Sequence, residues 1–93
     1  MPEFTPPLLA SLSRPTKWHH LKCDSEPFAA VSLGIKKSEF RLNDRGFENG
    51  DAIVLHEQER GKLTGRTQSA VITHIQTGYG IPDGYAMISL HLL

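Results

Sequence analysis

Apolar and polar residues alternate along much of this chain, and the period of that alternation predicts a protein built mainly of β-strands. A period of two places successive side chains on opposite faces of a strand. The alternation predicts strands at residues 18–23, 37–42, 52–59, 67–76 and 85–92. In contrast, Phe28, Val31 and Ile35 recur at intervals of three and four residues, which is typical of a helix.

The predicted helix has recognisable ends. Asp24 or Ser25 is suited to the N-cap, and Pro27 fits the first turn. Gly34 lies where a helix commonly ends on a residue in the left-handed conformation. A helix of about nine residues is too short to persist alone, so it must pack against a sheet.

Residues 34–51 combine a strand, a polar turn and many charges. The alternation directs Ser38, Phe40 and Leu42 toward the core, and Lys37, Glu39 and Arg41 toward solvent. Residues 43–46 (Asn-Asp-Arg-Gly) predict a turn, because Asn and Asp bond their own backbone and glycine accepts a positive φ. Phe47 then returns the chain to the core.

Five strands and one helix in so short a chain favour a mainly β (α+β) domain, a small antiparallel β-barrel of about five strands with one short helix. Residues 60–65 predict a hairpin connection between two of the strands. The predicted core consists of Leu21, Phe28, Val31, Phe40, Phe47, Leu55, Ile72, Ile88 and Leu90.

Composition limits the domain organisation and the location. The 93 residues make a single domain, which we place at residues 18–93, after a flexible proline-rich tail at residues 1–17. Ten basic and ten acidic residues cancel, so no overall field draws the protein to nucleic acid or to an anionic membrane. Cys23, the only cysteine, fits a reducing compartment, and no apolar run is long enough to span a membrane. We therefore expect a soluble, cytoplasmic protein.

Several short motifs together resemble a known family. They are His19-x-Leu21-Lys22, Gly34-x-Lys36-Lys37-x-Glu39-Phe40-Arg41, Asn43-Asp44-Arg45-x-Phe47-x-x-Gly50-Asp51, Thr64-Gly65-Arg66 and Gly78-Tyr79-Gly80-x-x-x-Gly84-Tyr85-x-x-x-Ser89-Leu90. In this combination the chain resembles the ASCH-like domains of the PUA-like superfamily, and in particular a branch of small bacterial and phage proteins of unassigned function. The resemblance covers residues 19–92.

The resemblance implies a PUA-like barrel with a cleft between helix and sheet, where related domains bind RNA or nucleotides. One related group of small enzymes removes the acetyl group from N4-acetylcytidine with a lysine and a threonine near the Gly-x-Lys motif. That lysine corresponds to Lys36 here, whereas Glu39 stands at the position of the threonine nucleophile. A carboxylate cannot repeat the acyl chemistry of an activated hydroxyl.

The basic residues of this region are candidates for phosphate binding. Lys22, Lys36, Lys37, Arg41 and Arg45 can form a cluster in which arginine offers a fork of donors and lysine a mobile charge. Alternatively, Glu39 and Asp44 neutralise them in weak surface pairs. Tyr79, between two glycines, can stack on a base or cover the core.

Two further candidates favour architecture over chemistry. Asp51 is expected to accept hydrogen bonds from backbone N–H groups at a strand entry. His19, His20 and Cys23 do not make a metal site, because adjacent histidines on a strand face opposite ways and no second cluster completes a tetrahedral set. A core-facing Cys23 is also a poor nucleophile, since burial raises its pKa. We expect no metal and no cofactor.

Three functions remain open from the sequence. The first is a module that binds RNA, a nucleotide or a nucleoside through Lys22, Lys36, Glu39 and Arg41, with Arg45 and Tyr79 as further contacts. The second is a small amidohydrolase acting on a modified nucleoside, with Lys36 as base and Glu39 activating water. The third is a phage or mobile-element accessory protein that binds a host protein.

Overall fold

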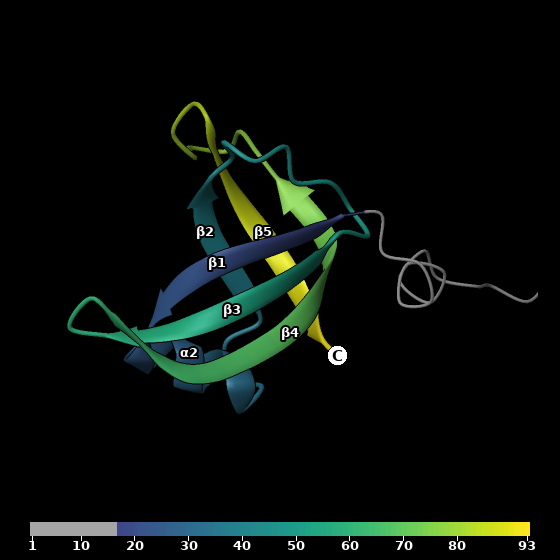
Figure 1. The fold of residues 1–93 in the computed structure, drawn as a ribbon. Coiled ribbons are helices and arrows are strands. Elements are labelled where there is room, and N and C mark those ends of the chain that lie inside the picture. The colour runs from purple at the N-terminus through teal and green to yellow at the C-terminus, as the bar shows by residue number, and fades with distance from the viewer. Residues whose placement is uncertain (1–16) are drawn as a thin grey trace, which may run out of the picture.

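A single curved sheet with one helix at its end makes up the domain (Figure 1). The computed structural model describes residues 17–93. The elements are β1 (Trp18–Asp24), α2 (Ser25–Ser32), β2 (Ser38–Leu42), β3 (Ala52–Glu59), β4 (Lys62–Gln76) and β5 (Tyr85–Leu92). The predicted mainly β class, with five strands and one short helix, is confirmed. The predicted tail lies outside the described residues except for Lys17, whose carbonyl accepts a hydrogen bond of 2.8 Å from the Ala52 N–H.

The strands follow the order β1-β3-β4-β5-β2 and curl into a half-barrel (Figure 1). Neighbouring strands are antiparallel except β1 and β3, which run parallel. The barrel expected from the sequence is mostly antiparallel, and this pair is its parallel exception. The physical reason is the crossover through α2 and β2, which returns the chain to the end where β1 began.

Strands β1 and β2 form the two edges of the half-barrel, and no backbone ladder joins them within residues 17–93. Two arginine side chains bridge the gap instead. Arg41 donates from Nη2 to the Lys22 carbonyl at 2.6 Å, and Arg45 donates from Nη1 to the His20 carbonyl at 3.1 Å. These contacts satisfy carbonyls of an edge strand and cover it with charge, which blocks pairing with another chain. We call this bridged gap the seam.

The core contains eight of the nine predicted residues, and Phe40 is the exception. Its side chain is 49% exposed, whereas its neighbour Glu39 is only 6% exposed. The predicted orientation of β2 is therefore wrong by one residue. Glu39 can face inward because Lys36 and Arg41 neutralise it.

Two predicted boundaries also differ. Strand β4 begins at Lys62 instead of residue 67, because Arg60 and Gly61, with φ of 51° and 77°, make a two-residue hairpin turn. Ile35 is exposed because α2 ends at Ser32, before the apolar stripe could reach it. Gly34 has φ of 77° and ends the helix as predicted.

Candidate functional site: a charged cleft at the seam

A cleft of about 430 Å³ opens at the seam, between the end of β1, the first turn of α2 and strand β2. Its lining residues are Lys22, Cys23, Asp24, Pro27, Lys36, Glu39, Phe40, Arg41, Leu42 and Gln58. The sequence predictions Lys22, Lys36, Glu39 and Arg41 thus meet in one place. Arg45 and Tyr79 do not line this cleft.

Glu39 is the buried centre of the cleft. One carboxylate oxygen accepts a hydrogen bond from Lys36 Nζ at 3.2 Å, and the other accepts one from Arg41 Nε at 3.0 Å. Lys36 Nζ also donates to the backbone carbonyl of Ser38. A buried carboxylate needs such partners, because an isolated charge out of water is very costly. The result is a fixed arrangement of one anion between two cations.

Arg41 links this arrangement to the opposite edge of the seam. Its Nε binds Glu39 and its Nη2 binds the Lys22 carbonyl, so these contacts use two of five N–H groups. The Arg41 side chain is 27% exposed. It therefore retains donors at the cleft surface while its orientation is held from both sides. Lys22, which is exposed, adds a second positive charge to the cleft.

Cys23 lies on the buried wall of the cleft. Burial raises the pKa of its thiol, and the negative charge of Glu39 raises it further, against the opposing effect of Arg41 and Lys36. The thiol is therefore protonated at neutral pH. The predicted core-facing position of Cys23 is confirmed, and a protonated thiol is a weaker nucleophile than a thiolate.

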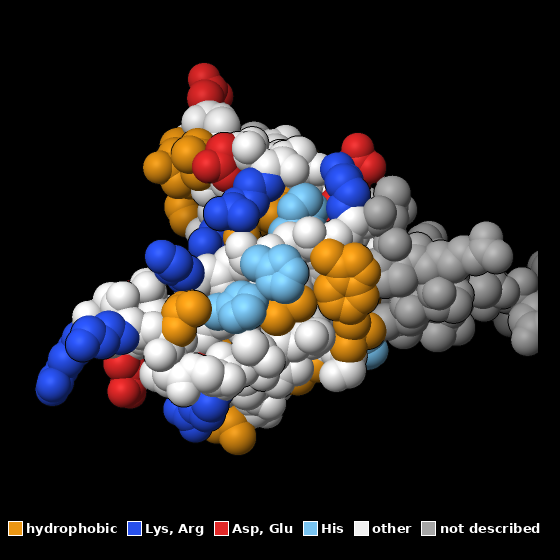
Figure 2. Space-filling model, in the orientation of Figure 1, with side chains coloured by type: hydrophobic (Ala, Val, Ile, Leu, Met, Phe, Trp, Pro, Cys, Tyr) orange, Lys and Arg blue, Asp and Glu red, His pale blue; other side chains and the backbone are white. Residues whose placement is uncertain are grey.

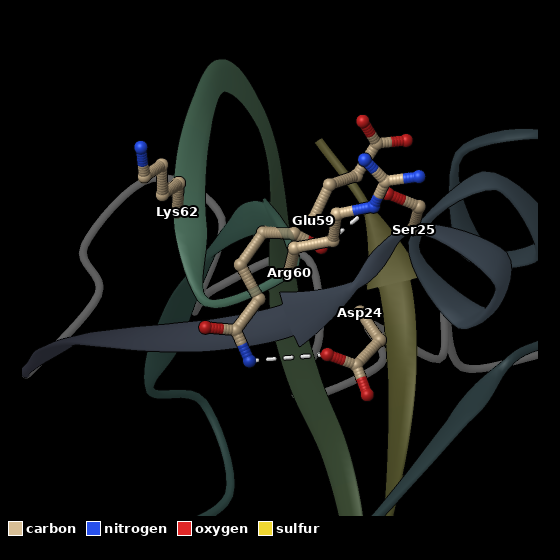
Figure 3. Close-up of a pocket in the computed structure, with 6 residues that line it drawn as sticks. Asp24, Ser25, Glu59, Arg60 and Lys62 are labelled. Atoms are coloured by element: carbon tan, nitrogen blue, oxygen red, sulfur yellow. Dashed lines mark hydrogen bonds between the residues drawn. The ribbon is translucent and has the colours of Figure 1, made fainter.

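A larger depression of about 700 Å³ lies next to the cleft, at the β3–β4 hairpin. It is lined by Asp24, Ser25, Gln58, Glu59, Arg60 and Lys62, and Asp24 and Gln58, hydrogen-bonded at 3.1 Å, line both hollows. In Figure 3, Arg60 and Glu59 reach over Ser25 while Lys62 points away. The two cations are balanced by two carboxylates and none of the lining residues is buried. The seam cleft, with buried Glu39 and Cys23, is the better-organised site.

A second buried carboxylate, that of Glu57, forms an ion pair with Arg66 that was not predicted from the sequence. Glu57, 1% exposed, accepts hydrogen bonds of 2.7 Å from both Nε and Nη2 of Arg66 and from the Thr64 hydroxyl. The Arg66 hydrogen bonds and that of Thr64 lower the pKa of Glu57, although burial acts in the opposite direction. The same pairing raises the pKa of Arg66, whose guanidinium covers the Phe28 ring at 5.9 Å.

Histidines make two separate contacts. On the outer face, His20 Nδ1 and His56 Nε2 lie 2.9 Å apart, and Figure 2 shows pale blue side chains together over β1 and β3 with basic groups nearby. On the inner face, His19 Nε2 lies 2.9 Å from Asp51 Oδ2. Within residues 17–93, no three metal-ligating side chains come together.

The remaining predicted residues have identifiable positions. Asp51 is fully buried and accepts a hydrogen bond of 3.0 Å from the Glu48 N–H, which confirms its predicted role at the strand entry. Tyr79 is 95% exposed with φ of 53°, so it does not cover the core. Arg45 lies 3.9 Å from Asp44 in an exposed pair, besides bridging the seam. Lys37 lies outside the cleft, in a neighbouring hollow.

The sequence interpretation missed Phe40, Leu42 and Gln58 as cleft residues. Phe40 and Leu42 were assigned to the core because large apolar residues are usually buried. The available signal was the charge pattern: Lys36 and Arg41 flank Glu39 closely enough to neutralise it inside. Gln58 carried no signal, since its contribution depends on the parallel pairing of β1 with β3.

The fold and the cleft together define a small half-barrel domain with a charged cleft at its open edge. The chain belongs to the family described as "Domain of unknown function (DUF3850)", which it matches over residues 18–90. It is 42% identical over 59 residues to the "Uncharacterized 12.9 kDa protein in GpA 3'region" of Escherichia phage P2. That alignment covers 63% of this chain and 54% of the relative, so the chain spans about half the length of the phage protein. Within residues 17–93, no helix is long and apolar enough to cross a membrane.

Proposed function

We propose that the seam cleft binds a nucleotide unit of RNA, as an ASCH-like or PUA-like module. The observation that carries the proposal is the buried Glu39 held between Lys36 and Arg41 at the surface of an open cleft. Such a cluster offers anion-binding donors and a hydrogen-bond acceptor within one nucleotide's reach. Its charge is local, which fits a protein whose overall charges cancel.

The residues divide the recognition between them. Arg41 and Lys22 supply the positive charge for a phosphate, with the guanidinium preoriented by its contact to the Lys22 carbonyl. Glu39 supplies acceptor lone pairs for an exocyclic amine or a ribose hydroxyl, because each of its oxygens has more than one. Cytosine, adenine and guanine carry such amines. The cleft is therefore suited to a base and its adjoining phosphate.

The alternative, a small amidohydrolase on a modified nucleoside, has weaker support. Lys36 Nζ is the donor toward both the Ser38 carbonyl and Glu39. In both contacts Lys36 acts as a hydrogen-bond donor, which is the role of a binding and positioning group and not that of a general base. Protonated Cys23 offers no replacement nucleophile. Binding without turnover is the simpler use of the same residues.

A titration followed by backbone amide chemical shifts tests the proposal. The ligands are a single-stranded RNA tetranucleotide, cytidine 5′-monophosphate and N4-acetylcytidine. We expect shifts at residues 22–24 and 36–42 with the first two and no release of acetate from the third. Lys36→Ala should weaken binding about tenfold, since it removes a charged donor. Lys37→Ala, a neighbouring lysine outside the cleft, is the matched control.

The other outcomes separate the alternatives. Release of acetate that disappears in Glu39→Gln would replace the binding module by a hydrolase. Absence of shifts with all three ligands would overturn both and leave a protein partner as the function. Equal losses in Lys36→Ala and Lys37→Ala would show that charge acts over the whole surface and that the cleft is not the site.

A further inference from the structure

The outer face of β2 and β5, beside the cleft, carries four large apolar side chains that a monomeric domain would ordinarily cover. We propose that Phe40 and Tyr85 form a stacking platform for a second base, so that the ligand is a single strand of nucleic acid rather than a free nucleotide. This inference rests on the proposed function of the cleft and names the class of ligand that it takes.

The platform is built by the reversed orientation of β2. Phe40 is 49% exposed and Tyr85 38% exposed, and their rings are 5.4 Å apart with an angle of 12° between their planes. Leu42 and Met87, 47% and 36% exposed, flank them. The register pairs Phe40 with Met87 and Leu42 with Tyr85, so all four side chains share one face of the β2–β5 ladder. The two rings stack on each other, so each ring keeps one face that the other ring does not cover.

The platform is continuous with the cleft. Phe40 and Leu42 line the cleft as well as the outer face, and Phe40 lies between Glu39 and Arg41 along β2. Glu39 and Phe40 point to opposite faces of β2. A strand with one base in the cleft at Glu39 therefore passes over the exposed edge of β2 to place its next base at the Phe40 ring.

The charges favour a nucleic-acid strand over an apolar protein surface as the occupant. Lys36 and Arg41 line the cleft beside Phe40, and Lys22 faces them from β1 across the seam, so the phosphates between two bases would pass between these cations. Proteins that bind single strands combine such a basic groove with aromatic side chains, because every base has a stacking face. An exposed apolar patch without this basic edge would fit a protein partner instead.

The test compares ligands of two lengths on one protein. Fluorescence anisotropy competition measures the affinity of cytidine 5′-monophosphate and of a single-stranded RNA tetranucleotide for the wild type, Phe40→Ala, Phe40→Trp and Leu63→Ala. We expect Phe40→Ala to weaken tetranucleotide binding about tenfold, the loss of one stacked base. Mononucleotide binding should weaken clearly less, because Phe40 lines only the rim that the cleft shares with the platform. Phe40→Trp should retain the tetranucleotide affinity. Leu63→Ala, which removes an exposed apolar side chain on the hairpin, should change neither.

Each other result overturns the platform in a distinguishable way. Equal wild-type affinity for both lengths, or a tetranucleotide affinity indifferent to Phe40→Ala, would leave the cleft as a nucleotide site and remove the platform. Absence of binding by either ligand would overturn cleft and platform together. Concentration-dependent self-association of the wild type that Phe40→Ala abolishes, without any effect on tetranucleotide affinity, would assign the apolar face to a second copy of the chain.

Discussion

Two buried glutamates in this domain have arginine partners, and the two sites are built differently. Glu57 is held by one bidentate arginine and a threonine hydroxyl, all at 2.7 Å. Glu39 is held by two separate cations at 3.0 and 3.2 Å, one of which also crosses the seam. The Glu57 pair covers the buried Phe28, whereas the Glu39 cluster opens into a cleft beside the exposed Phe40.

The difference separates a structural use of buried charge from a binding use. The Arg66 fork matches the Glu57 carboxylate and satisfies it fully, so this pair fastens the β3–β4 hairpin over the core. Lys36 and Arg41 share Glu39 at the wall of an open cleft. Burial of the carboxylate alone does not distinguish the two sites. Their surroundings do, because Arg66 covers the buried Phe28 ring whereas the Glu39 cluster lines a cleft.

The largest expected contrast is between the two phenylalanines. Phe28→Ala should lower the free energy of unfolding by about 3–5 kcal/mol, since it leaves a cavity beneath Arg66. Phe40→Ala should cost less than about 1 kcal/mol, because the ring is half exposed and its removal creates no enclosed cavity. Urea denaturation of both variants measures the contrast. Similar losses would mean that β2 faces the core with Phe40, as its sequence pattern first predicts.

The next contrast exchanges arginine for lysine at each carboxylate. Arg41→Lys should weaken tetranucleotide binding about tenfold, because an ammonium cannot bind Glu39, the Lys22 carbonyl and a phosphate from one plane. Arg66→Lys should leave that affinity unchanged while lowering the melting temperature. Anisotropy and thermal denaturation on the same preparations provide both values. A loss of affinity in Arg66→Lys would show that the two glutamates belong to one site.

The smallest contrast concerns pH. The pKa of Glu57 lies below its ordinary value of 4.5, so its ionised form stabilises the folded state above that pH and the benefit is lost as pH falls through the folded-state pKa. Glu57→Gln should therefore be less stable than the wild type at about pH 7, and the difference should shrink at about pH 3. Glu59→Gln, on the exposed end of the same strand, is the control. A difference that is constant with pH would mean that Glu57 acts through shape and not through charge.

The sequence predicts most of the architecture because its apolar periodicity is local. Strands β3 and β5 both have the predicted bounds, and Gly34 ends the helix as expected. Periodicity does not show which face of a strand is buried when ion pairing of a charged residue competes with burial of an apolar one. In β2 the ion pairs of Glu39 allow the carboxylate to be buried, and Phe40 is left half exposed. Periodicity also cannot show a parallel pairing between strands separated by other elements.

The candidate site was predicted in part for the same reason. Lys36, Glu39 and Arg41 are close in sequence, so their convergence follows from one short strand. Lys22 comes from another strand, and its place in the cleft depends on how the half-barrel curls. The Glu57–Arg66 pair depends on the position of the hairpin turn at Arg60 and Gly61, which the predicted hairpin at residues 60–65 made too long.

The strand order has a consequence for local unfolding. Strands β3, β4 and β5 are consecutive in sequence and central in the sheet, whereas β1 and β2 each pair with a single neighbour. Regions with fewer packed neighbours open at lower free-energy cost than the core of a sheet. Backbone amides of β1 and β2 should thus exchange hydrogen with solvent sooner than those of β4. A ligand bound at the seam would hold these two edge strands together. Its binding would therefore slow hydrogen exchange in both β1 and β2, although the two strands lie at opposite edges of the open sheet.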